Sequence, residues 1–156
     1  MCWYDNALLL QIRYQLEIVK SEYITLTGES VNNALVSRIL IPKNTKFAIF
    51  SNGEVIDDVE YRTRRINGKG GYAHYFGKGK IFDAYSSAIH GKCLASMGNN
   101  ALNLVNSRTG KRAVNNSNIV YKNNSLYLVT GKKDILAYEE IMYPYGKTYS
   151  KVDYIS

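Results

Sequence analysis

The chain is 156 residues long, which fits one domain with a substantial core, and its hydrophobic content of 46% is ordinary for a soluble globular protein. Its formal net charge of +7 indicates an acidic partner such as a nucleic acid or a nucleosome-like surface, although the same charge also serves solubility alone. Two cysteines exclude a disulfide framework and a four-ligand zinc site, and the two histidines add no metal-ligand spacing, so we expect no metal. Free thiols indicate a reducing compartment, and we expect an intracellular protein.

The chain opens with a short apolar run at 7–12. This run cannot span a bilayer, and it lacks the basic leader and cleavage site of a secretory signal, so we expect no membrane contact. Asp5 or Asn6 could cap a helix over residues 7–13. We therefore predict an N-terminal helical segment, 1–13.

Short strands then follow one another. Apolar residues alternate with polar ones over 14–20, which predicts a strand, and a second strand is expected at 23–26. Pro42 should end a further strand, because proline cannot donate to a ladder, and strands over 46–50 and 54–56 should follow.

The middle of the chain combines a helix with glycine-rich turns. Residues 57–65 predict a helix, with acids at its start and arginines near its end, as the helix dipole favours. Glycine-rich loops at 68–71 and 77–80 flank a strand at 72–76, and a further strand is expected at 80–84. A phosphate-binding loop is followed by a Ser or Thr and then by a helix, and neither glycine-rich loop has this continuation. We therefore expect both loops to be hairpin turns. So many short strands predict a mostly-β fold with short helices.

The last third of the chain carries the most specific pattern. An Asn-dense segment at 99–118 precedes an alternating strand, 126–129, and a basic turn, 131–134. Residues 135–146 then combine paired acids, a short hydrophobic run and a terminal Tyr-Gly, which predicts a strand that ends in an exposed aromatic residue.

These segments together resemble the signature of SET-domain protein lysine methyltransferases. In that family an Asn-His-Ser type motif precedes a Gly-Glu-Glu-Leu type turn that ends in Tyr-Gly, here matched by Asn99-Asn100 and by 139–146. The family's opening motif, Gly-x-Gly-Leu, falls on residues 32–35, where Asn32 and Ala34 replace both glycines. Glycine there lets the backbone approach the cofactor closely and take positive φ, and Asn tolerates such geometry better than most residues.

The resemblance covers roughly residues 14–149. It implies a SET-like (β-clip) fold of several small sheets over 14–149, followed by a C-terminal tail, 150–156. The cysteine cluster that binds zinc after the SET domain in many relatives has no counterpart here, and Tyr149 or Tyr154 of the tail could complete the substrate channel instead. A domain this small would suit a minimal enzyme of viral or microbial origin.

The resemblance also implies a function, which is methyl transfer from S-adenosylmethionine to a lysine side chain of a protein such as a histone. The reaction is an in-line displacement that needs alignment and an unprotonated amine, which an apolar aromatic channel favours. Tyr145 matches the catalytic tyrosine and also contacts the cofactor. The other cofactor-binding positions are Asn33, Ala34, Leu35, Asn99 and Asn100, and the channel wall is assigned to Tyr72, Tyr75 and Tyr143.

The Asn-rich segment leaves its register open. Asn100 stands in place of the family's His and Ala101 in place of Ser, while Asn103 and Asn106 offer competing alignments. Asn116 would be the Asn that closes the motif before the next strand. The alternative is that these residues form turns, since Asn side chains readily bond to nearby backbone.

Two other functions remain open from the sequence. The first is a catalytically inactive SET-like module that binds nucleic acid or protein through its positive charge, which the replaced glycines and His favour. The second is an unrelated basic β domain that binds RNA through Tyr and Lys side chains. The sequence leaves the oligomeric state unknown.

Overall fold

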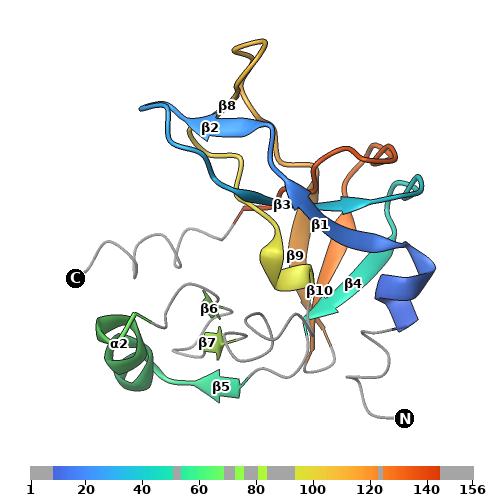
Figure 1. Cartoon of the computed structure of the whole chain (residues 1–156). Coiled ribbons are helices and arrows are strands. Elements are labelled where there is room, and N and C mark those ends of the chain that lie inside the picture. Colours follow the sequence, from blue (N-terminus) through green and yellow to red (C-terminus); the bar gives the residue numbers. More distant parts are fainter. Residues whose placement is uncertain are drawn as a thin grey trace.

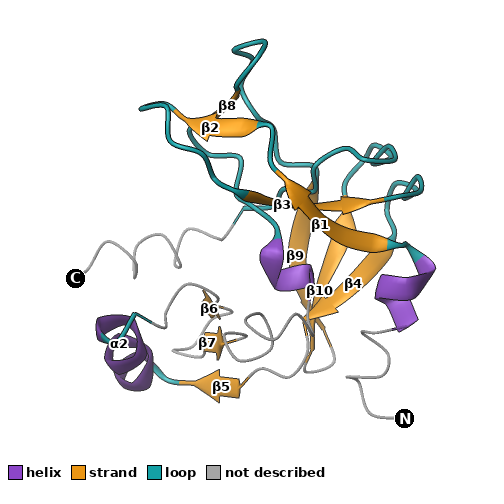
Figure 2. Ribbon diagram, viewed as in Figure 1, coloured by secondary structure: helices purple, strands orange, loops and turns teal. Residues whose placement is uncertain are grey.

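A computed structural model describes residues 9–50, 54–68, 73–75, 81–83, 94–122 and 125–144. Its strands form four small antiparallel sheets, and its helical segments are short (Figures 1 and 2). The prediction of a mostly-β fold built from several small sheets is confirmed.

The first half of the chain contributes to two strand pairs, one with a nearby strand and one with a strand far along the sequence. Residues 9–13 are helical, and β1 (Leu16–Lys20) then pairs with β3 (Asn33–Ser37). Between them β2 (Tyr23–Thr25) leaves the body of the molecule and pairs with β8 (Leu104–Asn106), so that the two form a projecting arm (Figure 1).

The central sheet has the order β4-β10-β9. Its strands are β4 (Lys46–Phe50), β10 (Ser125–Thr130) and β9 (Ser117–Lys122). Leu126 and Leu128 alternate with more accessible residues along β10 and are almost fully buried, as the two-residue repeat of a half-buried strand requires. These side chains belong to the main hydrophobic core, which also includes Phe47 and Phe50 of β4.

The fourth sheet lies beside a helix at the other end of the molecule (Figure 2). It has the order β5-β7-β6, from β5 (Glu54–Ile56), β7 (Ile81–Asp83) and β6 (Ala73–Tyr75). The helix, α2 (Asp58–Ile66), begins after Asp57, whose carboxylate accepts a hydrogen bond from Glu60 N at 2.8 Å. The predicted helix and its acidic N-cap are therefore confirmed.

One prediction about the backbone is wrong. Residues 135–143 do not form a continuous strand but make single bridges, at Ile135, Ile141 and Met142, to three different segments. A turn at Tyr138, with φ of 65°, interrupts the extended conformation between the first bridge and the second. The segment can therefore connect parts of the chain that no single ladder could join.

The part of the chain described above contains no helix long and apolar enough to cross a bilayer.

Candidate functional site

The segment 135–143 brings the resembled motifs together. Ile141 N donates to Leu35 O at 2.8 Å, and Tyr143 N donates to Asn99 O at 3.0 Å. The opening motif on β3 and the Asn-rich motif thus both contact this segment, and they contact each other through Asn33 and Asn99. The three stretches that carry the resemblance, far apart in sequence, meet at one place in the fold.

The opening motif accommodates the loss of both glycines. Asn32 has φ of 65°, the left-handed conformation in which glycine is favoured and Asn is tolerated. Ala34 is only 1% exposed and Leu35 is fully buried, so the methyl group of Ala34 is covered by protein and does not project towards solvent. Asn32 therefore adopts the left-handed backbone conformation of the opening motif without being a glycine.

Asn99 links the opening motif to the Asn-rich motif directly. Its side-chain amide donates to Asn33 O at 2.7 Å, while its own carbonyl accepts from Tyr143 N. Within the described residues no donor reaches its Oδ1, which leaves that atom able to accept a hydrogen bond from a ligand.

Asn100 has a different role in the structure. Its Oδ1 accepts from Leu102 N at 3.1 Å, the local bond of an Asx turn, and from Asn115 Nδ2 at 3.4 Å. Asn115 Oδ1 in turn accepts from Ala101 N at 2.9 Å. The side chain of Asn100 is thus engaged in shaping the turn, which leaves mainly its backbone for contact with a ligand.

The candidate Asn residues of the competing registers differ in what their side chains contact. Asn103 lies in a turn with φ of 61°, and Asn106 Oδ1 accepts from the backbone of Arg108 and Thr109 at 2.9 and 3.0 Å. Of the four candidates, Asn99 is the one whose side chain contacts the opening motif.

Asn116 holds the segment 139–142 through both ends of its amide. Nδ2 donates to Glu140 O at 2.8 Å and to Glu139 Oε2 at 3.0 Å, and Oδ1 accepts from Met142 N at 2.9 Å. Ser117 adds a hydroxyl bond to Met142 O at 2.9 Å. Asn116 therefore fixes the position of the segment 139–142.

Tyr143 lies in the core rather than at a surface. It is fully buried, its hydroxyl donates to Ala95 O at 2.7 Å, and its ring meets Phe50 edge-on at 6.1 Å. This place differs from the channel wall that the resemblance implies, because the hydroxyl is already bonded and the ring fills the interior. The buried ring and its hydroxyl bond thus fix the position of the backbone at residue 143.

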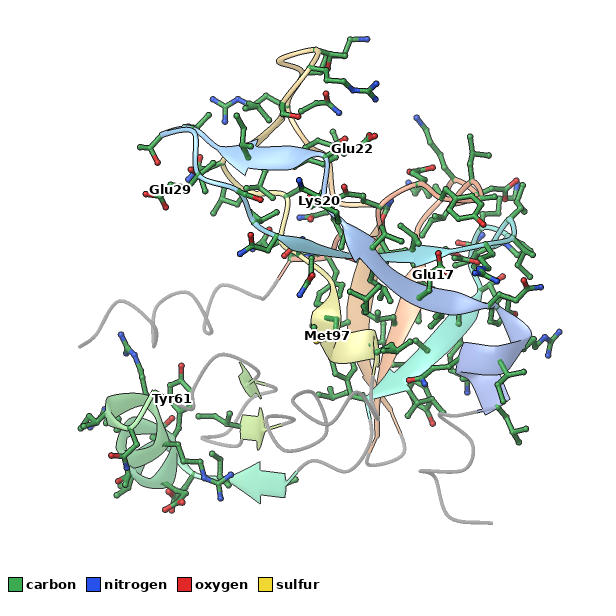
Figure 3. All side chains as sticks on the ribbon, viewed as in Figure 1. Glu17, Lys20, Glu22, Glu29, Tyr61 and Met97 are labelled. Carbon is green, nitrogen blue, oxygen red and sulfur yellow. The ribbon has the colours of Figure 1, made fainter. Side chains whose placement is uncertain are left out.

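The two acids of the motif hold separate segments. Glu139 Oε1 accepts from Leu136 N at 3.0 Å and closes the turn. Glu140 accepts from Glu22 N at 2.7 Å and from the Ser21 hydroxyl at 3.0 and 3.1 Å. Figure 3 labels Lys20 and Glu22, which lie where β1 passes into β2. Desolvation by burial raises the pKa of Glu140, and these donated hydrogen bonds offset part of the rise.

Three aromatic positions of the expected site cannot be placed as side chains. Tyr145 and Tyr72 lie outside the described residues, and of Tyr75 the structure describes only the backbone, on β6. The tail with Tyr149 and Tyr154 also lies outside them. Among the residues described, no group of three His, Cys, Asp or Glu side chains is placed to hold a metal ion.

Comparison with known proteins gives structural neighbours only. No protein-family model and no curated protein matches the chain. CpSET8 from Cryptosporidium aligns with a TM-score of 0.60 and 19% identity over 92% of this chain and 63% of its own. Chaetomium thermophilum Polycomb Repressive Complex 2 bound to GSK126 aligns with a TM-score of 0.58 and 20% identity over 88% of this chain and 16% of its own. The chain thus spans less than two thirds of either neighbour, its fold is SET-like, and these neighbours are SET-domain methyltransferases.

Proposed function

We propose that this protein transfers a methyl group from S-adenosylmethionine to a lysine side chain of another protein. One observation carries the proposal: Asn99 joins Asn33 of the opening motif to Tyr143, two residues before Tyr145, through bonds of 2.7 and 3.0 Å. These are the motifs on which the resemblance rests, and the neighbours in fold are SET-domain methyltransferases.

The residues of the site fit this cofactor. Asn32 has the left-handed backbone conformation that glycine favours, and the methyl of Ala34 is buried within the protein. Asn33 O and Leu35 O already accept from Asn99 and Ile141, so Asn33, Ala34 and Leu35 would flank the cofactor, while Asn99 Oδ1 and the backbone of Asn100 would bond to it. When bound, S-adenosylmethionine supplies a methyl group activated by a sulfonium sulfur.

The chain's own contribution to the reaction would be alignment and desolvation. A lysine amine attacks only when it is unprotonated, and an apolar channel lowers the pKa of the ammonium group by disfavouring its charge. Tyr145 would orient the amine with its hydroxyl, and Tyr72 and Tyr75 would wall the channel with their rings. Tyr143, buried beneath, would set the position of Tyr145 through its bond to Ala95 O.

Titration of S-adenosylmethionine into the purified protein by calorimetry tests the cofactor site. We expect saturable binding that Asn99→Ala weakens at least about tenfold, because one lost hydrogen bond with a polar partner costs about 1.5 kcal/mol. Asn118→Ala, an exposed Asn on β9, is the matched control and should bind as the wild type does. Absence of binding at millimolar cofactor would exclude the proposed enzyme.

Transfer of a labelled methyl group to a lysine-rich protein such as a histone tests the reaction itself. Tyr145→Phe should retain cofactor binding and lose most of the transfer, since only the hydroxyl is removed. Transfer at the wild-type rate by this variant would contradict the assignment of Tyr145.

A catalytically inactive SET-like binding module is the second candidate. It is favoured by the departures from the motif, Asn32 and Ala34 for glycine and Asn100 for His. Cofactor binding without transfer to any lysine substrate, or no cofactor binding together with retained partner binding, would support it over the enzyme.

A further inference from the structure

Two turns that are far apart in the sequence form one paired unit at the start of β4 and the end of β10. Asn44 N donates to Gly131 O at 3.0 Å, and Lys43 N donates to Asp134 Oδ1 at 2.8 Å. Thr130, only 3% exposed, ties the unit further through its hydroxyl, which donates to Pro42 O at 2.7 Å. Figure 1 shows the two turns beside each other at the upper right.

This unit displays four exposed lysines, which we call the lysine ridge: Lys43, Lys46, Lys132 and Lys133. The Lys46 ammonium lies 4.2 Å from the centre of the Tyr127 ring, which fixes it over the sheet. No carboxylate among the described residues forms an ion pair with any of the four. The carboxylate of Asp134, the acid within the two turns, accepts a backbone hydrogen bond instead.

A ridge of unpaired cations on a rigid support is costly to maintain by mutual repulsion unless an anion neutralises it. The hydrogen-bonded turns hold the lysine backbones in place, so little order has to be gained when a ligand binds. Lysine ammonium groups are compact point charges that suit phosphate oxygens without demanding one geometry.

We propose that the lysine ridge binds the phosphate backbone of a double-stranded nucleic acid, independently of base sequence. The net charge of +7 adds long-range attraction to a ligand that carries one charge per about 1.7 Å of its axis. The proposal does not rest on methyl transfer, because the ridge and the candidate site are separate. The bridge Ile41–Ile135 lies beside the ridge, whereas the bridge Asn99–Met142 lies at the other end of the segment 135–143.

An anionic membrane is the main rival ligand. Leu40 precedes the first of the paired turns in the sequence and Leu136 follows the second. Their side chains are 45% and 59% exposed and could contact lipid. The tips of the turns nevertheless carry lysines with Asn44 and Gly131, and no large apolar side chain that would enter a bilayer first. This arrangement favours the nucleic acid.

Fluorescence anisotropy with a labelled 20-base-pair DNA of arbitrary sequence, between 50 and 200 mM salt, tests the proposal. Four phosphate contacts predict a slope of log affinity against log salt of about −3.6. The double variant Lys132→Gln with Lys133→Gln should bind at least about tenfold more weakly, and its slope should be smaller by about 2. Lys111→Gln with Arg112→Gln is the matched control, because it removes two exposed cations from the turn that follows β8.

The outcomes separate the alternatives. Wild-type affinity and slope in the control, with both reduced in the ridge variant, support the proposal. Equal losses in the two variants would show that total charge alone acts, and this would overturn the ridge as a site. Binding to vesicles containing phosphatidylserine without binding to DNA would overturn it in favour of a membrane, and binding to neither would remove it.

Discussion

Gly98 and the ring of Tyr143 are in such close contact that a side chain on Gly98 has no room. A Cβ atom on Gly98 would lie 2.3 Å from Cε1 of Tyr143, far inside van der Waals contact. Since Tyr143 is itself fully buried and bonded to Ala95, the ring cannot move aside without disturbing the core. The glycine just before Asn99 is thus required by packing.

Gly98→Ala should therefore lower the free energy of unfolding by about 3 kcal/mol, the upper range for overpacking of a rigid core. Urea unfolding followed by circular dichroism measures the change. Gly131→Ala is the matched control, because a Cβ there meets no atom within 4 Å, and its unfolding midpoint should not shift. Equal stability of the two variants would refute the contact.

Asn116→Ala should lower the free energy of unfolding by about 2 kcal/mol, because it removes three hydrogen bonds and leaves Met142 N without its acceptor. Asn118→Ala, exposed on the same strand, should be nearly neutral. If the segment 139–142 also carries Tyr145 into the site, Asn116→Ala should reduce methyl transfer by more than it reduces cofactor binding. An Asn116→Ala variant with the stability of the Asn118→Ala protein would show that the clamp contributes nothing.

Tyr138→Gly should raise the free energy of unfolding by about 0.5–1 kcal/mol. Tyr138 has φ of 65°, and glycine relieves the strain of this left-handed conformation by more than it adds to the conformational entropy of the unfolded chain. Its side chain is 59% exposed, so little apolar burial is lost. Tyr138→Ala keeps the strain and should not stabilise; if it stabilises as much as glycine, the backbone explanation fails.

Ionisation of Glu140 should lower the free energy of unfolding at neutral pH. Because burial raises its pKa in the folded protein above the ordinary value of 4.5, the folded state holds the proton more tightly than the unfolded state. The resulting stabilisation is fully present below pH 4.5 and is lost as the pH rises through the folded pKa. Wild-type protein should therefore lose more stability between pH 4.5 and pH 7 than Glu140→Gln does, as measured by urea unfolding at several pH values.

If the free energy of unfolding depends on pH in the same way for Glu140→Gln and wild type, burial does not raise the pKa of Glu140.

Local signals in the sequence determined most of the strands and the helix α2. Alternation along the chain located β1 and β10, whereas β4 followed from an apolar run after Pro42 that is buried from Phe47 to Phe50. Asp57 marked the start of α2 because its carboxylate can cap the first backbone amides within a few residues. The left-handed tolerance of Asn32, too, follows from its own side chain.

Only the tertiary structure decided how residues 135–143 run and which Asn joins the motifs. The composition of residues 135–143 predicts a continuous strand. In the structure this segment makes three single bridges instead, because Ile135, Ile141 and Met142 each pair with a different segment. Asn99, Asn100, Asn103 and Asn106 look alike in sequence, and their roles differ only through the neighbours that the fold supplies. Tyr143 entered the core for the same reason: the residues that surround it, Gly98 and Phe50, lie more than forty positions away.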